Sequence, residues 1–133
     1  TQKSEVDIHE MSPLALAFVG DAVLELLVRA RLVGTTRLQP NRLHTVATHY
    51  VSAHAQNLEL DIIEPMLTDA EAAVLRRGKN ASKATVAKHA TVQEYRASTG
   101  FECLLGWLYL NGQLARVHEL FETLWQSFDP NEK

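Results

Sequence analysis

The chain has 133 residues, of which 46% are apolar and 22% are charged, with a net charge of −3. This length corresponds to one compact domain, and the composition excludes collagen, coiled coils and wholesale disorder. A single cysteine, Cys103, excludes an intramolecular disulfide and fits a reducing compartment. No apolar run reaches the roughly 18 residues of a membrane span, and residues 1–5 lack the apolar core of a secretory signal. We therefore expect a soluble cytoplasmic domain.

The first half of the chain predicts two helices. Apolar residues recur with the helical period of 3.6, and no stretch keeps the alternation that a strand requires. The first helix begins after an N-cap at Ser12 and is ended by Gly34 together with Thr35 and Thr36. Residues 14–32 are apolar on almost every side, so we expect this helix inside the fold. The second helix begins at Pro40 and runs to about Leu60.

The second half predicts three more helices. Thr68 and Glu71 form a capping box for the third helix, which is expected to end near Gly78. Residues 79–90 have no convincing period and indicate a loop. The last two helices are predicted over about 91–110 and 113–128. The chain thus reads as one all-α domain, a helical bundle, with the boundaries 1–10 (N-terminal extension), 11–128 (domain) and 129–133 (C-terminal tail).

Basic residues concentrate between residues 76 and 96. This window holds six of the 13 basic residues and one of the 16 acidic residues, so the rest of the chain is strongly acidic. Such segregation predicts a local positive patch on an acidic protein. The alternative is a solvated surface loop.

Two carboxylates interrupt otherwise apolar helical stretches, Asp21 in the first predicted helix and Glu102 in the fourth. Burying an ionised carboxylate is costly unless it is paired, hydrogen-bonded or bound to a cation. Gly20 and Gly106 permit close helix approach, and a crossing at these glycines would bring the two acids together. An oxygen-only pair of this kind suits Mg²⁺ or Mn²⁺ and is common in phosphoryl transfer.

A structural role for these acids is the alternative, with Arg29 or Arg96 as the pairing partner. Glu25 lies one turn after Asp21, so it either joins the acidic cluster or has a structural role, as a solvated residue or paired with Arg29 at i+4, and we prefer the structural role. Zinc is not predicted, because histidines spaced by five residues are rotated by about 140° from one another on a helix. These histidines are His44, His49 and His54.

In the stretches Phe18–Glu25 and Gly100–Leu110 the chain resembles the ribonuclease III catalytic domain. The two stretches occur in that family's order, with Asp21 and Glu102 about eighty residues apart. Three further motifs resemble the Mini-ribonuclease III branch, which lacks a double-stranded-RNA-binding domain. They are Val51-Ser52-Ala53, Arg76-Arg77-Gly78-Lys79-Asn80-Ala81 and Tyr95-Arg96-Ala97-Ser98-Thr99.

The resemblance implies a homodimeric, Mg²⁺-dependent endoribonuclease, with Mn²⁺ as a substitute, that cleaves double-stranded RNA. In the Mini branch the implied substrate is the base-paired end of the large-subunit (23S) ribosomal RNA precursor, and a ribosomal protein that presents it is a further possible partner. Asp21 and Glu102 take the catalytic and metal-binding roles, whereas the other two acidic positions of the larger enzymes fall on Ala17 and Thr99. The RNA-binding residues expected from the basic segment are Arg76, Arg77, Lys79, Asn80, Lys83, Lys88 and Arg96.

A homodimer is also expected from the amount of apolar surface. Two strongly apolar helices exceed what the remaining short helices can cover, and exposed apolar patches mark interfaces. Leu14 and Phe18 are the candidate contacts, with burial in a monomer core as the alternative. Two other functions remain open at this point: a non-catalytic RNA- or ribosome-binding module of the same fold, and a helical interaction protein.

Overall fold

The computed structural model describes residues 5–82 and 90–131, and within them the chain forms only helices, which confirms the all-α class. None of these helices combines the length and apolar character needed to cross a membrane. The elements are η1 (Ile8–Glu10), α1 (Pro13–Thr35), α2 (Pro40–Val51), α3 (Ala53–Ile63), η2 (Glu64–Met66), α4 (Asp69–Ala81), α5 (Val92–Leu110) and α6 (Leu114–Ser127).

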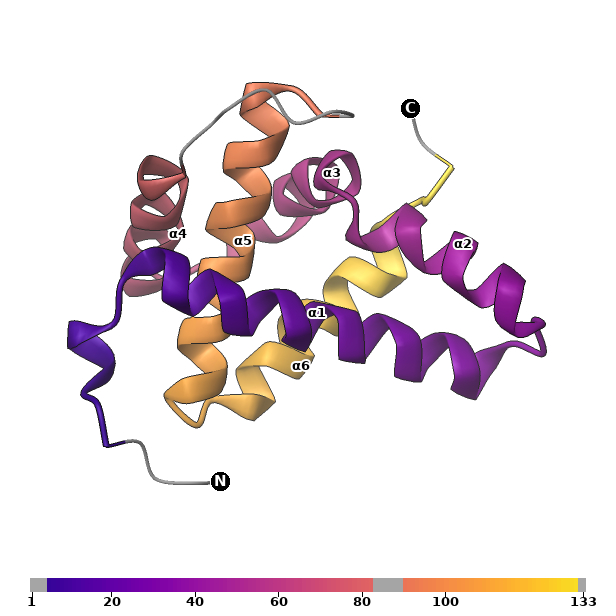
Figure 1. Cartoon of the computed structure of the whole chain (residues 1–133), viewed down its shortest axis with the longest axis horizontal. Helices are drawn as coiled ribbons and strands as arrows, with labels where there is room; N and C mark the ends of the chain where they lie inside the picture. The colour runs from indigo at the N-terminus through magenta and orange to yellow at the C-terminus, as the bar shows by residue number, and fades with distance from the viewer. Residues whose placement is uncertain (1–4, 83–89, 132–133) are drawn as a thin grey trace.

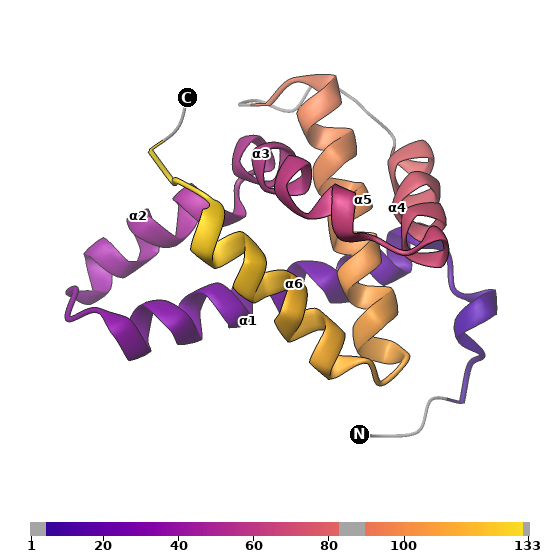
Figure 2. The same cartoon turned by 180° about the vertical axis from the view of Figure 1, so that it is seen from behind.

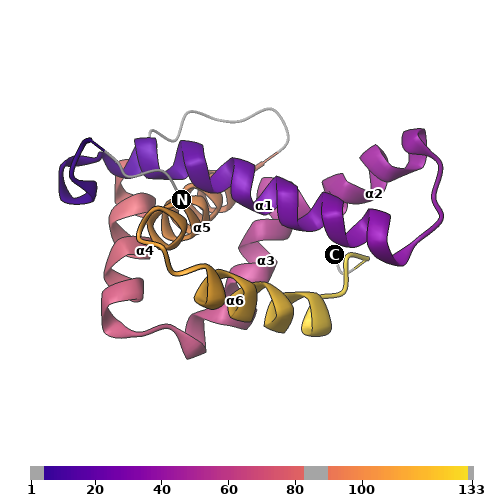
Figure 3. The same cartoon turned by 90° about the horizontal axis from the view of Figure 1, so that it is seen from below.

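Helix α5 is the centre of the fold. In Figure 1, α1 crosses α5 and α4 lies beside it. The opposite view shows α6 and α3 on the other side (Figure 2). Figure 3, seen nearly along α5, shows α1, α3, α4 and α6 around it, whereas α2 lies apart from α5, beside the C-terminal half of α1. In the middle of α5, Phe101, Leu104, Leu105 and Leu108 are at most 2% exposed and join the main core with residues of α1, α3 and α6. The packing of neighbouring helices against α5 therefore fixes the position of its backbone, from which polar side chains such as Glu102 project.

Side-chain N-caps stand at the starts of α1, α3, α4 and α5, and those of α1 and α4 were predicted from local sequence. The Ser12 hydroxyl accepts a hydrogen bond from the Ala15 N–H at 3.1 Å. Thr68 forms the predicted capping box with Glu71 at the start of α4. The start of α5 has a second capping box, which the sequence analysis did not single out, formed by Thr91 and the side chain of the residue three positions later.

One predicted helix boundary in the first half of the chain is confirmed and another is wrong. Helix α1 ends at Thr35 with Thr36 as its C-cap, as predicted, and the hydroxyls of Thr35 and Thr36 donate to carbonyls one turn back. The single helix predicted from residue 40 to residue 60 is two helices. The chain turns at Ser52, whose ψ of 158° is extended and whose hydroxyl accepts the Ala55 N–H.

The predicted end of the third helix at Gly78 is also wrong, since α4 continues to Ala81. A Cβ atom on Gly78 would lie 2.7 Å from the Cβ of Cys103 and 2.9 Å from the Cα of Gly100. Gly78 therefore allows α4 to lie close against α5 and does not end the helix. The predicted loop accordingly loses residues 79–81 to α4, and residues 83–89 lie outside the described part of the chain.

Helix α1 is not buried on every side, which corrects the expectation from its composition. Leu16, Leu24 and Val28 are 1% exposed, whereas Phe18 is 83% exposed and Leu26 is 69% exposed. Phe18 and Leu26 lie eight positions apart, which places them on the same side of the helix. That side presents an apolar surface which the described residues of this chain do not cover.

Candidate active site

Helices α1 and α5 cross with their backbones in contact at the two glycines singled out from the sequence. A Cβ atom on Gly20 would lie 1.6 Å from the carbonyl oxygen of Glu102. A Cβ atom on Gly106 would lie 1.9 Å from the carbonyl oxygen of Leu16. Any side chain at either position would force the helices apart. The prediction of a close crossing at Gly20 and Gly106 is confirmed, and it determines where the neighbouring acids lie.

The crossing brings the carboxyl groups of Asp21 and Glu102 together. Asp21 is exposed and Glu102 is half-buried. Burial is the main cause that raises the pKa of Glu102 to about 7, and the nearby negative charge of Asp21 raises it further. A hydrogen bond from Gln56 acts in the opposite direction. The site is therefore a pair of acids whose negative charges oppose each other.

Glu25 contributes to the same negative field but also has a partner of its own. Its carboxylate accepts a hydrogen bond from the Arg29 Nε at 3.1 Å, which is the i+4 pair considered from the sequence. Its charge is nevertheless close enough to raise the pKa of Glu102. Among residues 5–82 and 90–131, neither Asp21 nor Glu102 forms an ion pair, and Arg96 bonds elsewhere.

The donor set at this crossing fits a divalent cation. Mg²⁺ is commonly bound through one or two carboxylates and retains several waters. Asp21 and Glu102 offer such a pair, and a cation would relieve the repulsion that raises the Glu102 pKa. Within the described residues, no group of three or more histidine, cysteine, aspartate or glutamate side chains is arranged to hold a metal. The fit is therefore to a hydrated hard cation, and a closed zinc site is not formed by these residues.

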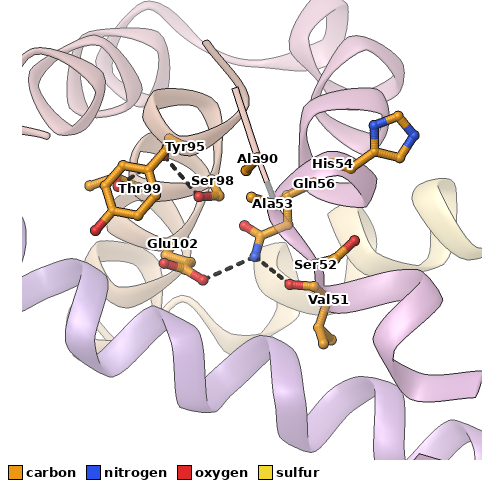
Figure 4. A pocket seen from close by; sticks show the side chains of 10 residues that line it. All are labelled: Val51, Ser52, Ala53, His54, Gln56, Ala90, Tyr95, Ser98, Thr99 and Glu102. Carbon is orange, nitrogen blue, oxygen red and sulfur yellow. Dashed lines mark hydrogen bonds between the residues drawn. The ribbon is translucent and has the colours of Figure 1, made fainter. Parts of the chain in front are cut away.

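A cavity of about 420 Å³ lies beside Glu102, between α3 and α5 (Figure 4). It is lined in part by hydroxyl-bearing residues, namely Ser52, Tyr95, Ser98 and Thr99. Gln56 reaches across it from α3, and its Nε2 donates to the Oε2 of Glu102 at 3.0 Å. The break between α2 and α3 at Ser52 places the start of α3 opposite Glu102, so the error in the predicted helix concealed this side of the site.

The resemblance to the larger ribonuclease III enzymes implies two further acidic positions, which are Ala17 and Thr99 in this chain. Both residues are buried, and neither carries a carboxylate. Ala17 and Thr99 are each 7% exposed. The Thr99 hydroxyl bonds to the Tyr95 carbonyl at 3.1 Å and to the Ser82 hydroxyl at 3.4 Å. Thr99 therefore joins the end of α4 to α5 one turn before Glu102, at the wall of the cavity.

The basic residues predicted to contact RNA gather at the C-terminal end of α4. Arg76 and Arg77 are exposed on α4. Arg96 reaches over from α5, where its Nε donates to the Lys79 carbonyl and its Nη2 to the Asn80 side chain, both at 3.0 Å. Arg96 thus stabilises the end of α4 while remaining exposed. The remaining two predicted contacts, Lys83 and Lys88, lie outside the described residues.

Two polar residues at the cavity were missed by reasoning from the sequence. Gln56 carried no motif signal beyond its position one turn after Ser52. His54 was considered only as a metal ligand, but its Nδ1 pairs with the Glu94 carboxylate at 2.5 Å. The pKa of Glu94 is lowered mainly by the hydrogen bond that its carboxylate accepts from the Thr91 backbone N–H. The hydrogen bond with His54 lowers it further. His54 therefore links α3 to α5 at the cavity wall.

Comparison with known proteins places these features in a family. The ribonuclease III domain family matches residues 14–113. Mini-ribonuclease 3 of Enterococcus faecalis is 46% identical over 116 residues, which cover 86% of this chain and 88% of that protein. Mini-ribonuclease 3 of Brevibacillus brevis is 42% identical over 91% of this chain and 92% of that protein. A crystal structure of a protein from Fusobacterium nucleatum has a TM-score of 0.82 at 28% identity and covers 90% of this chain and 96% of that one. The chain belongs to the ribonuclease III domain family, in its Mini-ribonuclease 3 branch.

Proposed function

We propose that this chain is a Mg²⁺-dependent endoribonuclease that cleaves double-stranded RNA, with the paired ends of the 23S ribosomal RNA precursor as substrate. The observation that carries the proposal is the pairing of Asp21 and Glu102 at the α1–α5 crossing, in a chain of the ribonuclease III domain family. Under this proposal the enzyme acts in the cytoplasm, and a ribosomal protein assists by presenting the stem.

Asp21 and Glu102 hold the cation in this mechanism, and Mn²⁺ can replace Mg²⁺. When bound, the cation supplies activation of water and stabilisation of negative charge on the phosphate. The two carboxylates neutralise and orient it, which requires both to be ionised. The fixed backbone contact at Gly20 holds the α5 backbone at Glu102 against α1, so the two acids are positioned before RNA arrives. The adjacent cavity provides room beside Glu102 for the RNA backbone.

RNA binding is assigned to the basic end of α4 and to Arg96. An A-form duplex is recognised mainly by its shape, through phosphates and 2′-hydroxyl groups, and this requires exposed cations along one surface. Arg76, Arg77 and Arg96 supply exposed cations, the half-buried Lys79 adds a further positive charge, and Asn80 adds a neutral hydrogen-bonding side chain. Thr99 bonds to Ser82 just beyond this basic end, and the same residue lines the cavity beside Glu102, so the RNA-binding surface continues to the acids. Lys83 and Lys88 are assigned the same role on their charge alone.

A homodimer completes the proposal. The exposed apolar side of α1, formed by Leu14, Phe18, Leu26 and Val33, is the surface that a second copy would cover. Cleavage of both strands of a duplex requires two sites related by two-fold symmetry, which an isologous dimer provides. Burial of these side chains between two copies also explains why α1 is apolar on almost every side.

The test is incubation of the protein with a long double-stranded RNA and with either of its single strands, in Mg²⁺ or in EDTA. Shortening of the duplex alone, in Mg²⁺ alone, is the expected result, and Glu102→Gln should abolish it. The substrate assignment predicts faster cleavage of a 23S precursor stem than of an unrelated duplex of equal length. Addition of ribosomal proteins to the precursor tests the presentation step.

A non-catalytic RNA-binding module is the second candidate, favoured by Ala17 and Thr99 where the larger enzymes carry acids. In that case the duplex is retarded in a gel but stays intact in Mg²⁺. A helical interaction protein would neither retard nor cut it. Either result contradicts the proposed activity.

A further inference from the structure

Gln56 occupies an unusual position for a carboxamide. It is 1% exposed, among the most buried polar residues of the described chain. Its Nε2 donates one hydrogen bond to the Oε2 of Glu102 and a second to the carbonyl of Val51, each at 3.0 Å (Figure 4). The second bond anchors the side chain to the backbone just before the N-cap of α3. Gln56 therefore connects the α2–α3 junction to one oxygen of Glu102.

The orientation of this amide follows from its partners. Both are acceptors, so the NH₂ end must face them. The other end, Oε1, is then buried with no hydrogen-bond partner among the described residues. A buried unpaired oxygen costs stability, and an apolar side chain of similar size would fill the space without that cost. The cost indicates that the NH₂ end has a role which an apolar residue could not supply.

We propose that Gln56 is a positioning residue for the metal-binding carboxylate of Glu102. Contact with Gly20 holds the backbone of Glu102, and the Gln56 donor holds one of its carboxylate oxygens. Gln56 does not bond to the other carboxylate oxygen of Glu102, which remains available to the cation. A fixed donor also offsets part of the negative charge that Asp21 and Glu25 direct at this carboxylate. This inference rests on the proposed function, because it assumes a cation at Asp21 and Glu102.

The first test measures Mn²⁺ binding without RNA, from the electron paramagnetic resonance signal of free Mn²⁺. Residues that orient metal ligands typically contribute tenfold or more to metal affinity. Gln56→Met keeps the length of the side chain and removes the donor, so we expect about tenfold weaker binding. Glu59→Gln is the matched control, since Glu59 is equally buried one turn further along α3 and has no bond to Glu102. It should bind Mn²⁺ as the unaltered chain does.

A second measurement separates positioning from a merely structural role. In duplex cleavage, Gln56→Met should raise the half-saturating Mg²⁺ concentration about tenfold and leave the rate at saturating Mg²⁺ within about threefold. A structural role would instead lower the rate at every Mg²⁺ concentration. Should Gln56→Met fail to fold by circular dichroism, Gln56→Asn, whose amide is one methylene too short to make both bonds, decides the matter with the same expectation.

Two outcomes are distinguishable. In the first, a folded Gln56 variant binds Mn²⁺ within twofold of the unaltered chain, whereas Asp21→Asn weakens binding. This result overturns the positioning role of Gln56 and leaves the metal site standing. If Asp21→Asn also leaves Mn²⁺ binding unchanged, the metal site of the proposed function fails as well.

Discussion

Glu59 makes the stability of this protein depend on pH in an unusual direction. Its side chain is 0% exposed, and neither carboxylate oxygen has a hydrogen-bond partner in the described residues. Burial raises its pKa from 4.5 to about 9. Between these values the unfolded chain releases a proton that the folded chain retains. The contribution of Glu59 to folded-state stability is therefore most favourable below pH 4.5 and becomes less favourable as the pH rises towards 9.

The size of this effect follows from the two pKa values. Each pH unit between them corresponds to about 1.4 kcal/mol. The penalty that Glu59 imposes on folding is thus about 3 kcal/mol at pH 7 and about 5 kcal/mol at pH 8. A typical domain has a free energy of unfolding of about 5–15 kcal/mol. One buried acid therefore removes a large share of the stability at neutral pH.

Glu59→Gln tests this reasoning, because the amide has nearly the same shape and does not ionise. Urea unfolding followed by circular dichroism, at one protein concentration, should show variant and unaltered chain within about 1 kcal/mol of each other at pH 5. The variant should gain about 1.4 kcal/mol for each pH unit up to pH 8. Asp61→Asn, on the exposed side of the same helix, is the control and should show no such gain. A stability difference for Glu59→Gln that is the same at pH 5 and pH 8 would refute the argument.

Three further predictions concern the proposed function. Asp21→Asn should abolish cleavage and slightly stabilise the metal-free protein, because like charges no longer face each other; wild-type turnover at limiting Mg²⁺ would contradict it. Neutralising Arg76, Arg77 and Lys79 together should weaken duplex binding and reduce the slope of log affinity against log salt by up to about 3, as gel shifts at several salt concentrations measure; an unchanged slope would remove this segment from the interface. Phe18→Glu should convert a dimer into a 14.9 kDa monomer in sedimentation equilibrium at micromolar protein, since Phe18 is 83% exposed on the apolar side of α1. An unaltered chain that sediments as a monomer and still cuts both strands in one encounter would show that no dimer is needed.

Local chemistry in the sequence was sufficient for the helical class, for the starts of α1, α2, α4, α5 and α6, and for the central crossing. The caps at Ser12 and Thr68 act within one turn, so their signals need no knowledge of the rest of the fold. The crossing was predictable because Gly20 and Gly106 interrupt apolar helices beside unexpected acids. Only residues without a Cβ allow the backbone contact found there.

Other features depended on contacts between segments far apart in the chain. The 3.6-residue period continues through Ser52, so the break between α2 and α3 left no mark in the apolar pattern. Gly78 has the same local signal as a helix end, but packing against Cys103 keeps it within α4. Gln56 and Glu59 are ordinary polar residues in sequence, and only the packing of α3 against α5 and the core buries them. Local preference is a weak force that acts over one or two turns, whereas burial and hydrogen-bond partners are decided by which helices meet. The sequence thus determined the pair of acids, and the tertiary structure determined the side chains that hold and surround them.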